Sequence, residues 1–364
     1  AQPEVEALLK EYEFYYNIEE PDPDDESVPV LLQNNSIVTP FEAVTGMYSL
    51  PGRHDIDPTA ILAPFYFLFF GLMLSDAAYG LILTTLCAII LKKYKPEGTT
   101  HRMIKMFMFC GLSTFMWGAL FGGWFGNFFT VAAKTFFGKE FVIKPLWFDP
   151  LSEPMRLLVV SLILGAIHLF VGMGVQAYMD IKDGRPLDAL FDIGLWYLLL
   201  IGIVLFAFGG KLGAGAVGIG KIMAIVGAVG ILLTGGRKKK GIFGKLTGGL
   251  GSLYGITSYL SDVLSYSRLL ALGLATGVVA QVFNTLGSLA GGGIAGSILL
   301  IVVFVFGTVF NIAINALGAF VHSCRLQYVE FFGKFYTGGG RPFAPFERKT
   351  KYIKILKEGN DNVK

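Results

Sequence analysis

Two arginines flank a long uncharged part of the chain, where a charged side chain is costly. Residues 269–324 contain no Asp, Glu, Lys or Arg, and Arg268 and Arg325 stand at either end of this stretch. An arginine near the centre of a bilayer costs about 2.5–3.5 kcal/mol on insertion scales, so it normally faces a protein interior or a water-filled cavity. Both arginines are therefore candidates for ion or anion chemistry, although Arg325 is close enough to its helix end to reach a headgroup.

Other polar residues gather around these arginines. Asp262 precedes Arg268 by six residues, and Asn311, Asn315 and His322 follow one another at i, i+4 and i+11. That spacing predicts a polar stripe on one side of a helix. We interpret the stripe as half of a hydrated ion path to the cytoplasm, with Asp262 beside the external half. The alternative is that these small polar residues are hydrogen-bonding contacts between helices.

The elements that hold these residues are transmembrane helices. Of the 364 residues 53% are hydrophobic and only 16% charged, against about 25% charged in an average soluble domain. This composition excludes a soluble enzyme, a disordered tail, a collagen-like fibre and a disulfide scaffold. The fold class we predict is an all-α polytopic bundle of about eight transmembrane helices. The charge-free segments place them at 59–74, 77–93, 104–132, 155–180, 190–209, 219–235, 252–286 and 297–335.

The last two predicted helices are unusually long. A span needs about 20 residues to cross the hydrocarbon core, whereas 252–286 and 297–335 have 35 and 39 residues. They must therefore tilt, bend or extend beyond the bilayer. Two steeply tilted helices, each with an arginine, suit the outside of a cylindrical partner.

Composition divides the chain into three parts. Residues 1–57 carry 13 of the 27 acidic residues, and we expect them to be the end of a cytoplasmic N-terminal domain. Residues 58–335 form the eight-helix transmembrane domain, and 336–364 a basic cytoplasmic tail. With eight spans, 20 Lys and Arg residues fall on the side of the termini and six on the other. By the positive-inside rule both termini then face the cytoplasm.

Four segments together resemble one family. They are Leu264–Ala275 around Arg268; Val321–Phe332, with His-x-x-Arg-Leu-x-x-Val-Glu; Pro64-Phe65 followed by Gly71–Gly80; and Gly165–Gly172. Each segment is similar to a motif in the membrane half of subunit a, also called subunit I, of V-type and A-type rotary ATPases. The matches extend over about 58–346 in the family's order. The family usually has Gly-Asp where this chain has Ser75-Asp76.

The resemblance implies a stator subunit that transports H⁺ or Na⁺. Its membrane half would form two offset half-channels against a ring of proteolipid subunits, and Arg268 would meet the ring carboxylate. His322 and Arg325 would belong to the cytoplasmic half-channel or support Arg268. Asn315 stands where eukaryotic members have glutamate, so a proton-relay role does not transfer directly. The candidate ion-translocation residues are Arg268, Arg325, His322, Asp262, Asn315, Glu330, Asn311, Gln327, Asp76 and His168.

The resemblance also implies the surroundings. We expect the proteolipid ring, peripheral-stalk subunits of the E/G type through the N-terminal domain, and lipid as partners, with a central-stalk subunit as a further candidate. The chain would be a non-catalytic subunit in a prokaryotic plasma membrane, without cofactor, metal or nucleic acid. The alternatives are a secondary transporter or channel that binds an anionic substrate through these arginines, and a membrane scaffold. A transporter predicts an inverted repeat, which the sequence does not display.

Overall fold

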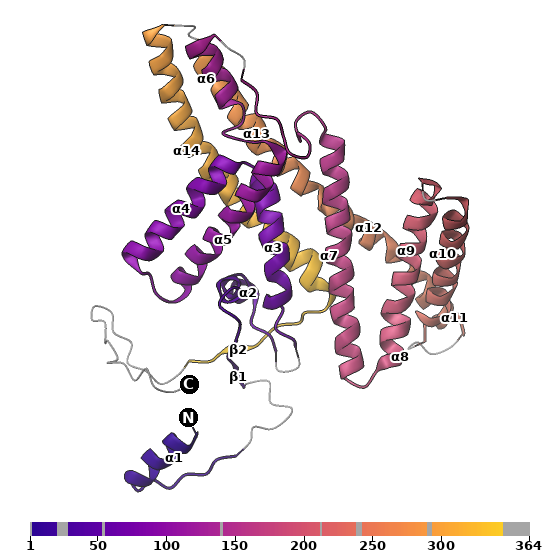
Figure 1. The fold of residues 1–364 in the computed structure, drawn as a ribbon. Coiled ribbons are helices and arrows are strands. Elements are labelled where there is room, and N and C mark those ends of the chain that lie inside the picture. Colours follow the sequence, from indigo (N-terminus) through magenta and orange to yellow (C-terminus); the bar gives the residue numbers. More distant parts are fainter. Residues whose placement is uncertain are drawn as a thin grey trace.

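The computed structural model describes residues 2–19, 28–52, 55–138, 141–211, 213–237, 242–289 and 293–344. These residues are almost entirely helical (Figure 1). The acidic run 19–26 and the basic tail beyond 344 lie largely outside the described residues, as do Lys139 and Lys239 of the predicted loops on opposite membrane sides.

The elements follow one another in this order along the chain. They are α1 (Gln2–Glu11), β1 (Pro29–Val30), η1 (Thr39–Phe41), α2 (Glu42–Tyr48), α3 (Thr59–Leu74), α4 (Ala77–Tyr94), α5 (Gly98–Phe121), α6 (Phe128–Phe137), α7 (Pro154–Lys182), α8 (Pro186–Asp188), η2 (Ala189–Gly194), α9 (Leu195–Phe208), η3 (Gly209–Lys211), α10 (Ala214–Thr234), α11 (Ile242–Tyr254), α12 (Ile256–Ser265), α13 (Ser267–Ser288), α14 (Ile294–Arg325), η4 (Leu326–Phe331), η5 (Phe332–Lys334) and β2 (Arg341–Pro342).

The helices confirm an all-α membrane fold. Among the described residues seven helical segments are long and apolar enough to cross a bilayer, and α3 adds a shorter apolar helix of 16 residues. The two longest are Thr247–Ser288, with 42 residues, and Ile294–Lys334, with 41. Both exceed what a perpendicular span needs. In Figure 1 α12, α13 and α14 run obliquely to α7. The extra length of these two segments is thus explained by their tilt.

Two predicted helices are interrupted. The expected helix 104–132 ends at Phe121, because Gly122 takes a left-handed conformation with φ of +73°, and α6 begins only at Phe128. The expected helix 252–286 is divided into α11, α12 and α13, with breaks at Gly255 and Tyr266. The second break lies two residues before Arg268, so it decides how that side chain is presented.

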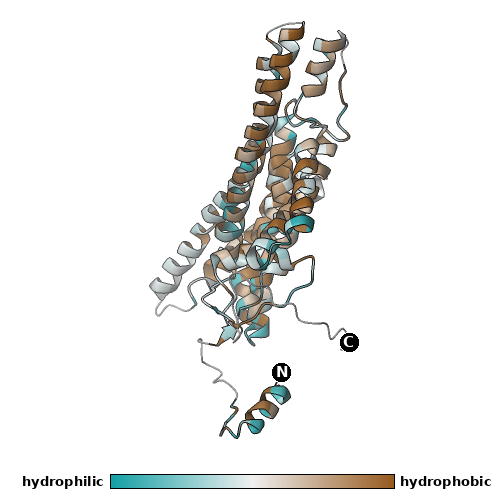
Figure 2. Cartoon of the chain, turned by 90° about the vertical axis from the view of Figure 1, so that its left-hand side faces the viewer, coloured by the Kyte–Doolittle hydropathy of each residue, from teal (hydrophilic) through white to brown (hydrophobic). Residues whose placement is uncertain are grey.

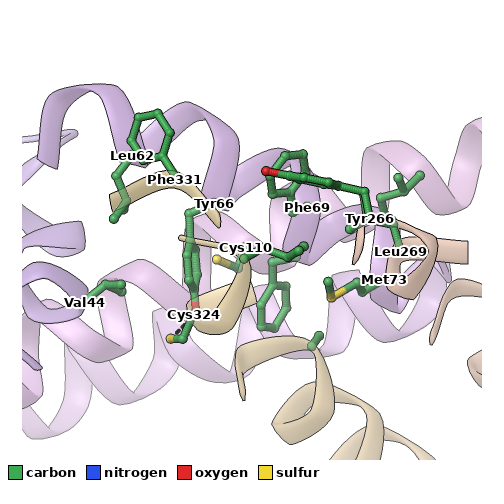
Figure 3. Close-up of a cluster of buried hydrophobic side chains, with 14 of the residues drawn as sticks. Val44, Leu62, Tyr66, Phe69, Met73, Cys110, Tyr266, Leu269, Cys324 and Phe331 are labelled. Atoms are coloured by element: carbon green, nitrogen blue, oxygen red, sulfur yellow. Dashed lines mark hydrogen bonds between the residues drawn. The ribbon is translucent and has the colours of Figure 1, made fainter. Parts of the chain in front are cut away.

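A central body and a lateral group of helices make up the molecule. In the body α3 packs against α5, α13 and α14, and α7 packs against α12 and α13. Its core contains the buried side chains of Tyr66, Phe69 and Tyr266, drawn in Figure 3. The lateral group, α9 to α11, lies beside α7 in Figure 1 and has a smaller core around Trp196 and Ile231.

A clasp near the two chain ends joins segments far apart in sequence. Val30 of β1 pairs in parallel with Pro342 of β2, and the backbone of Leu50 bridges to Gly340. The Tyr328 hydroxyl donates to the Val44 carbonyl at 2.7 Å. Part of 1–57, which we expected to belong to a soluble domain, is thus packed on the helical body.

We use this clasp to name the two ends of the body. The tail side is the end with the clasp and the carboxyl end of α7; the loop side is the opposite end, with α6 and residues 122–127. Figure 2 shows hydrophobic residues along most of the helices and more hydrophilic residues toward the tail side. This distribution agrees with helices that cross a membrane and end in water on the tail side.

Candidate functional site

The break at Tyr266 places Arg268 at the first turn of α13. Tyr266 closes α12 with hydrogen bonds from its N–H to the carbonyls of Val263 and Leu264, and α13 begins at the next residue. The Tyr266 side chain is fully buried, next to Phe69 and Leu269 (Figure 3). Because the phenol ring is fixed in the core, the backbone that leads into Arg268 is fixed with it.

His168 on α7 holds Tyr266 from the other side. Its Nδ1 lies 2.8 Å from the Tyr266 hydroxyl, and its ring is stacked on Phe331 with centroids 4.3 Å apart. Gly165, one turn earlier on α7, leaves room for the ring of Tyr266: a Cβ there would lie 2.3 Å from it. His168 therefore positions the α12–α13 break. This structural role is additional to the ion-path role that we predicted from the sequence.

Arg268 faces an almost fully buried glutamate. Its Nη2 donates to Oε1 of Glu330 at 3.4 Å, and the side chains are 21% and 2% exposed. Glu330 lies in η4, a π-helical segment that continues α14. A π-helical turn changes which side chains face inward and is frequent at functional sites. Here it keeps both Gln327 and Glu330 buried.

His322 is partly buried and lies on α14 about one helical turn before Arg325. Arg325, one turn further on, is exposed, and within the described part of the chain it forms no ion pair. It stands on the outer face of α14 together with exposed Leu317 and Val321, and exposed Val329 follows in η4. We call Arg268, His322, Arg325, Gln327 and Glu330 the arginine region.

Unpaired polar atoms are concentrated in and beside this region. Eight buried side-chain nitrogen or oxygen atoms of the described residues make no hydrogen bond, and six of them belong to Arg268, His322, Gln327, Glu330 and His168. Leaving such an atom unsatisfied costs about 1–3 kcal/mol, and more for a charged group. The arginine region thus has hydrogen-bonding capacity that water, a partner or a small rotation of Gln327 toward His168 can use.

Two asparagines that we expected on the same path have a different environment. Asn311 donates to the Tyr79 hydroxyl at 2.9 Å and to the Thr276 carbonyl at 3.1 Å, and Asn315 donates to the carbonyl and side-chain oxygens of Asn311. Both are buried. In this asparagine region (Tyr79, Thr276, Asn311 and Asn315) the polar atoms have partners within the protein, which is the arrangement of interhelical hydrogen-bonding contacts.

Asp76 is also engaged with backbone. Its carboxylate accepts from the N–H groups of Ala78 and Tyr79, as the N-cap of α4, and from those of Phe125 and Gly126 at 3.2 and 2.9 Å. It is 3% exposed. Asp76 thus ties the loop 122–127 to the start of α4, which is a structural role.

Asp262 lies on the tail side of Arg268, where it pairs with Lys334. The Lys334 ammonium contacts the Asp262 carboxylate and lies 4.4 Å from the centroid of the Tyr259 ring. We expected Asp262 beside the external half of the path, opposite the side of the termini; its partner instead stands at the tail-side end of the last helix. Lys334 was missed from the sequence because it looks like an ordinary basic residue after a span.

Cavities lie on both sides of Arg268 along α12 and α13. The tail-side cavity, about 540 Å³, is bounded by α7, η2, α12 and η5, with Asp180, Asp188, Tyr259 and Lys334 in its wall. The loop-side cavity, about 210 Å³, has Asp76, Asn127, Gly273, Gly277 and Gln281 in its wall. Tyr259 precedes Arg268 by nine residues and Gly273 follows it by five, so along the chain Arg268 lies between the residues of α12 and α13 that line the two cavities, although it lines neither. Among the described residues no group of three or more His, Cys, Asp or Glu side chains could hold a metal.

Comparisons with known proteins agree with the resemblance found in the sequence. Residues 256–348, which contain the arginine region, match the V-type ATPase 116kDa subunit family. The chain is 36% identical to A-type ATP synthase subunit I of Methanocaldococcus jannaschii, over 93% of this chain and 52% of that protein.

Two further relatives have related names. A-type ATP synthase subunit I of Thermococcus kodakarensis is 36% identical, over 97% of this chain and 54% of its own length. V-type ATP synthase subunit I of Chlamydia muridarum is 25% identical, over 95% of this chain and 60% of its own. The chain thus spans about half the length of the archaeal relatives that it matches.

Proposed function

The chain is a homologue of subunit I of A-type and V-type ATP synthases, and from this premise we propose that it is the ion-translocating stator subunit of a rotary ATPase. In this proposal it is a non-catalytic subunit in the plasma membrane of a prokaryote, with both termini in the cytoplasm. It carries H⁺ or Na⁺ along two half-channels against a proteolipid ring. The observation that carries the proposal is the position of Arg268 between two cavities that lie toward opposite ends of the helical body.

The cavities fit the two half-channels. The larger one lies on the tail side and would connect with the cytoplasm, while the smaller one follows Gly273 and Gly277 toward the other surface. Arg268 lies between them, and its charge would repel a cation that tried to pass directly from one to the other. An ion could then cross only by binding to a ring carboxylate from one half-channel and being released from it into the other.

Arg268 would act on the carboxylate of each ring subunit. A cation within about 4–6 Å favours the ionised form of a carboxylate, so the ring group would release its ion as it passes. Glu330 orients the guanidinium through one nitrogen, while Nη1 has no partner among the described residues. Because this nitrogen is buried, the guanidinium would have to turn outward to meet a second carboxylate.

The outer face of the last two helices would be the surface for the ring. On α14 it includes exposed Ile314, Leu317 and Val321, which lead to Arg325, and on α13 exposed Val278 and Val282. An exposed apolar stripe is compatible with lipid as well as with protein. The arginines at its tail-side end favour a partner that carries negative charge at mid-membrane.

Stalk subunits would bind elsewhere. The clasp puts residues 28–52 against the tail side of the helical body, so a preceding N-terminal domain would stand on that side. We propose that E/G-type peripheral-stalk subunits hold this domain, that a central-stalk subunit is a further contact, and that 58–335 is the membrane domain.

The decisive experiment substitutes Arg268 in the assembled complex. Arg268→Ala should abolish ATP-driven ion uptake into reconstituted vesicles, while the ring and stalk subunits still co-purify. Lysine at 268 should rescue poorly, because its ammonium lacks the planar fork and loses its proton more readily when desolvated. Near-normal uptake by assembled Arg268→Ala complexes would reject the proposal and favour a transporter that binds an anionic substrate.

A further inference from the structure

One ion pair separates the tail-side cavity from the arginine region. Lys334 and Tyr259 are part of the cavity wall, whereas Asp262, which Lys334 contacts, is not. Lys334 and Asp262 are 16% and 20% exposed. Further in, Tyr266 is fully buried and stands between Asp262 and Arg268 along the chain. The Lys334–Asp262 pair therefore stands at the edge of the cavity, with Asp262 six residues before Arg268 along the chain.

The ammonium of Lys334 occupies the position at Asp262 that a transported cation would take. A carboxylate binds Na⁺ by the same attraction, and takes up H⁺ as a covalent O–H bond; either event neutralises the carboxylate and removes its attraction for the ammonium. Lysine suits such exchange because its charge is a compact group on a flexible four-carbon stem. The Tyr259 ring, whose centroid lies 4.4 Å from the ammonium, already attracts it and would continue to do so if the contact with Asp262 were lost.

We propose that Lys334 is a tethered cation that gates the tail-side half-channel, and that Asp262 is the relay carboxylate which it covers. When a transported cation arrives, the ammonium leaves Asp262 and moves outward into the cavity, still beside the Tyr259 ring, and Asp262 binds the cation on its way to or from Arg268. When no cation is present, Lys334 returns and the path is closed. This inference rests on the proposed function and adds a gate to it.

The test measures passive ion flux through the membrane sector. Complexes that contain the ring but lack the ATP-hydrolysing part are reconstituted in vesicles, and flux is driven by an imposed potential. Lys334→Gln removes the competing charge and should raise the flux about fivefold, the change expected from a barrier lower by about 1 kcal/mol. Asp262→Asn removes the relay and should lower the flux at least as much. Lys334→Arg, the matched control, keeps the charge and should stay near the unmodified rate or below it.

A purely structural ion pair predicts other results. The two single substitutions would then lower flux alike, and the neutral pair Lys334→Gln/Asp262→Asn would restore it, because replacing both charges is often tolerated. The gate predicts that the double variant stays as slow as Asp262→Asn. The double variant leaves no unpaired charge, so it decides the question even where Lys334→Gln alone fails to assemble. Wild-type flux through the double variant would overturn the gate.

The gate and the proposed function fail in different ways. Uptake by the assembled Arg268→Ala complex would contradict the proposed function. Loss of uptake in Arg268→Ala, together with equal effects of Lys334→Gln and Asp262→Asn, would leave the function standing and reject only the gate.

Discussion

The arginine region and the asparagine region lie on the same pair of helices, yet they satisfy their polar groups in opposite ways. Asn311 and Asn315 find partners in each other, in Tyr79 and in the backbone of α13. Several buried atoms of Arg268, His322, Gln327 and Glu330 have no partner among the described residues. Inside a membrane such atoms are expensive, because the hydrocarbon offers no hydrogen bonds.

The difference teaches how to read polar residues in a membrane helix. A polar group that is satisfied within the protein contributes to packing, and the fold alone explains it. A buried polar group that is left unsatisfied indicates something absent from the chain itself, such as water, an ion or a partner subunit. By this criterion we propose that the arginine region is the part of the polar stripe that acts in transport, and that the asparagine region supports it.

Cysteine labelling gives the largest expected contrast between the two regions. In a background with Cys87, Cys110 and Cys324 replaced by alanine, His322→Cys should react with a small water-soluble thiol reagent and Asn315→Cys should not. A site that reacts only after a local opening costing about 3 kcal/mol is slower by about a hundredfold. Val303→Cys, on the apolar part of α14, serves as the unreactive control. Equal labelling of 315 and 322 would remove the distinction.

Glu330→Gln tests whether the ion pair with Arg268 matters for transport. A hydrogen bond between charged groups contributes about 1.5–3 kcal/mol, so its weakening should lower ion uptake per assembled complex about tenfold. Glu42→Gln is the matched control, because Glu42 is also a buried glutamate paired with an arginine, Arg102 at 3.1 Å, but far along the chain from Arg268. If both variants reduce uptake equally, Glu330 has only a general structural role.

Arg325→Ala should have a smaller effect. This arginine is exposed and adds positive charge near His322 without a partner of its own among the described residues. Because water screens an exposed charge, its removal should weaken uptake about threefold to fivefold rather than abolish it. Arg156→Ala, which breaks an exposed pair with Glu153 on the loop side, should leave uptake unchanged. A loss as complete as that of Arg268→Ala would make the two arginines equivalent.

Asn315→Leu should change transport least. Leucine has a similar size but cannot donate to Asn311, so the folded protein should lose about 1 kcal/mol of stability. The melting temperature in detergent should fall, while uptake per assembled complex changes by less than about twofold. An uptake loss comparable to that of Glu330→Gln would place Asn315 on the ion path after all.

The sequence alone determined the all-α membrane class and the two positions of interest on the last helices. Apolar segments about 20 residues long have few alternatives to a transmembrane helix, because the backbone must satisfy its own hydrogen bonds in lipid. A charge in hydrocarbon is costly, so the two arginines that lie within predicted hydrophobic helices, Arg268 and Arg325, could be identified from the sequence as candidate functional residues. The four motif segments added the family, which the comparisons confirmed.

Only the tertiary structure decided which polar residues work together. The i, i+4, i+11 spacing puts Asn311, Asn315 and His322 on one side of α14, but spacing along one helix does not say what the neighbouring helix offers. Tyr79 and Thr276 come from α4 and α13 and satisfy the two asparagines. Lys334 reaches Asp262 across 72 positions of the chain, and the break at Tyr266 depends on His168 of α7. Contacts between distant segments depend on how whole helices pack against one another. The spacing of polar residues along a single helix does not contain that information.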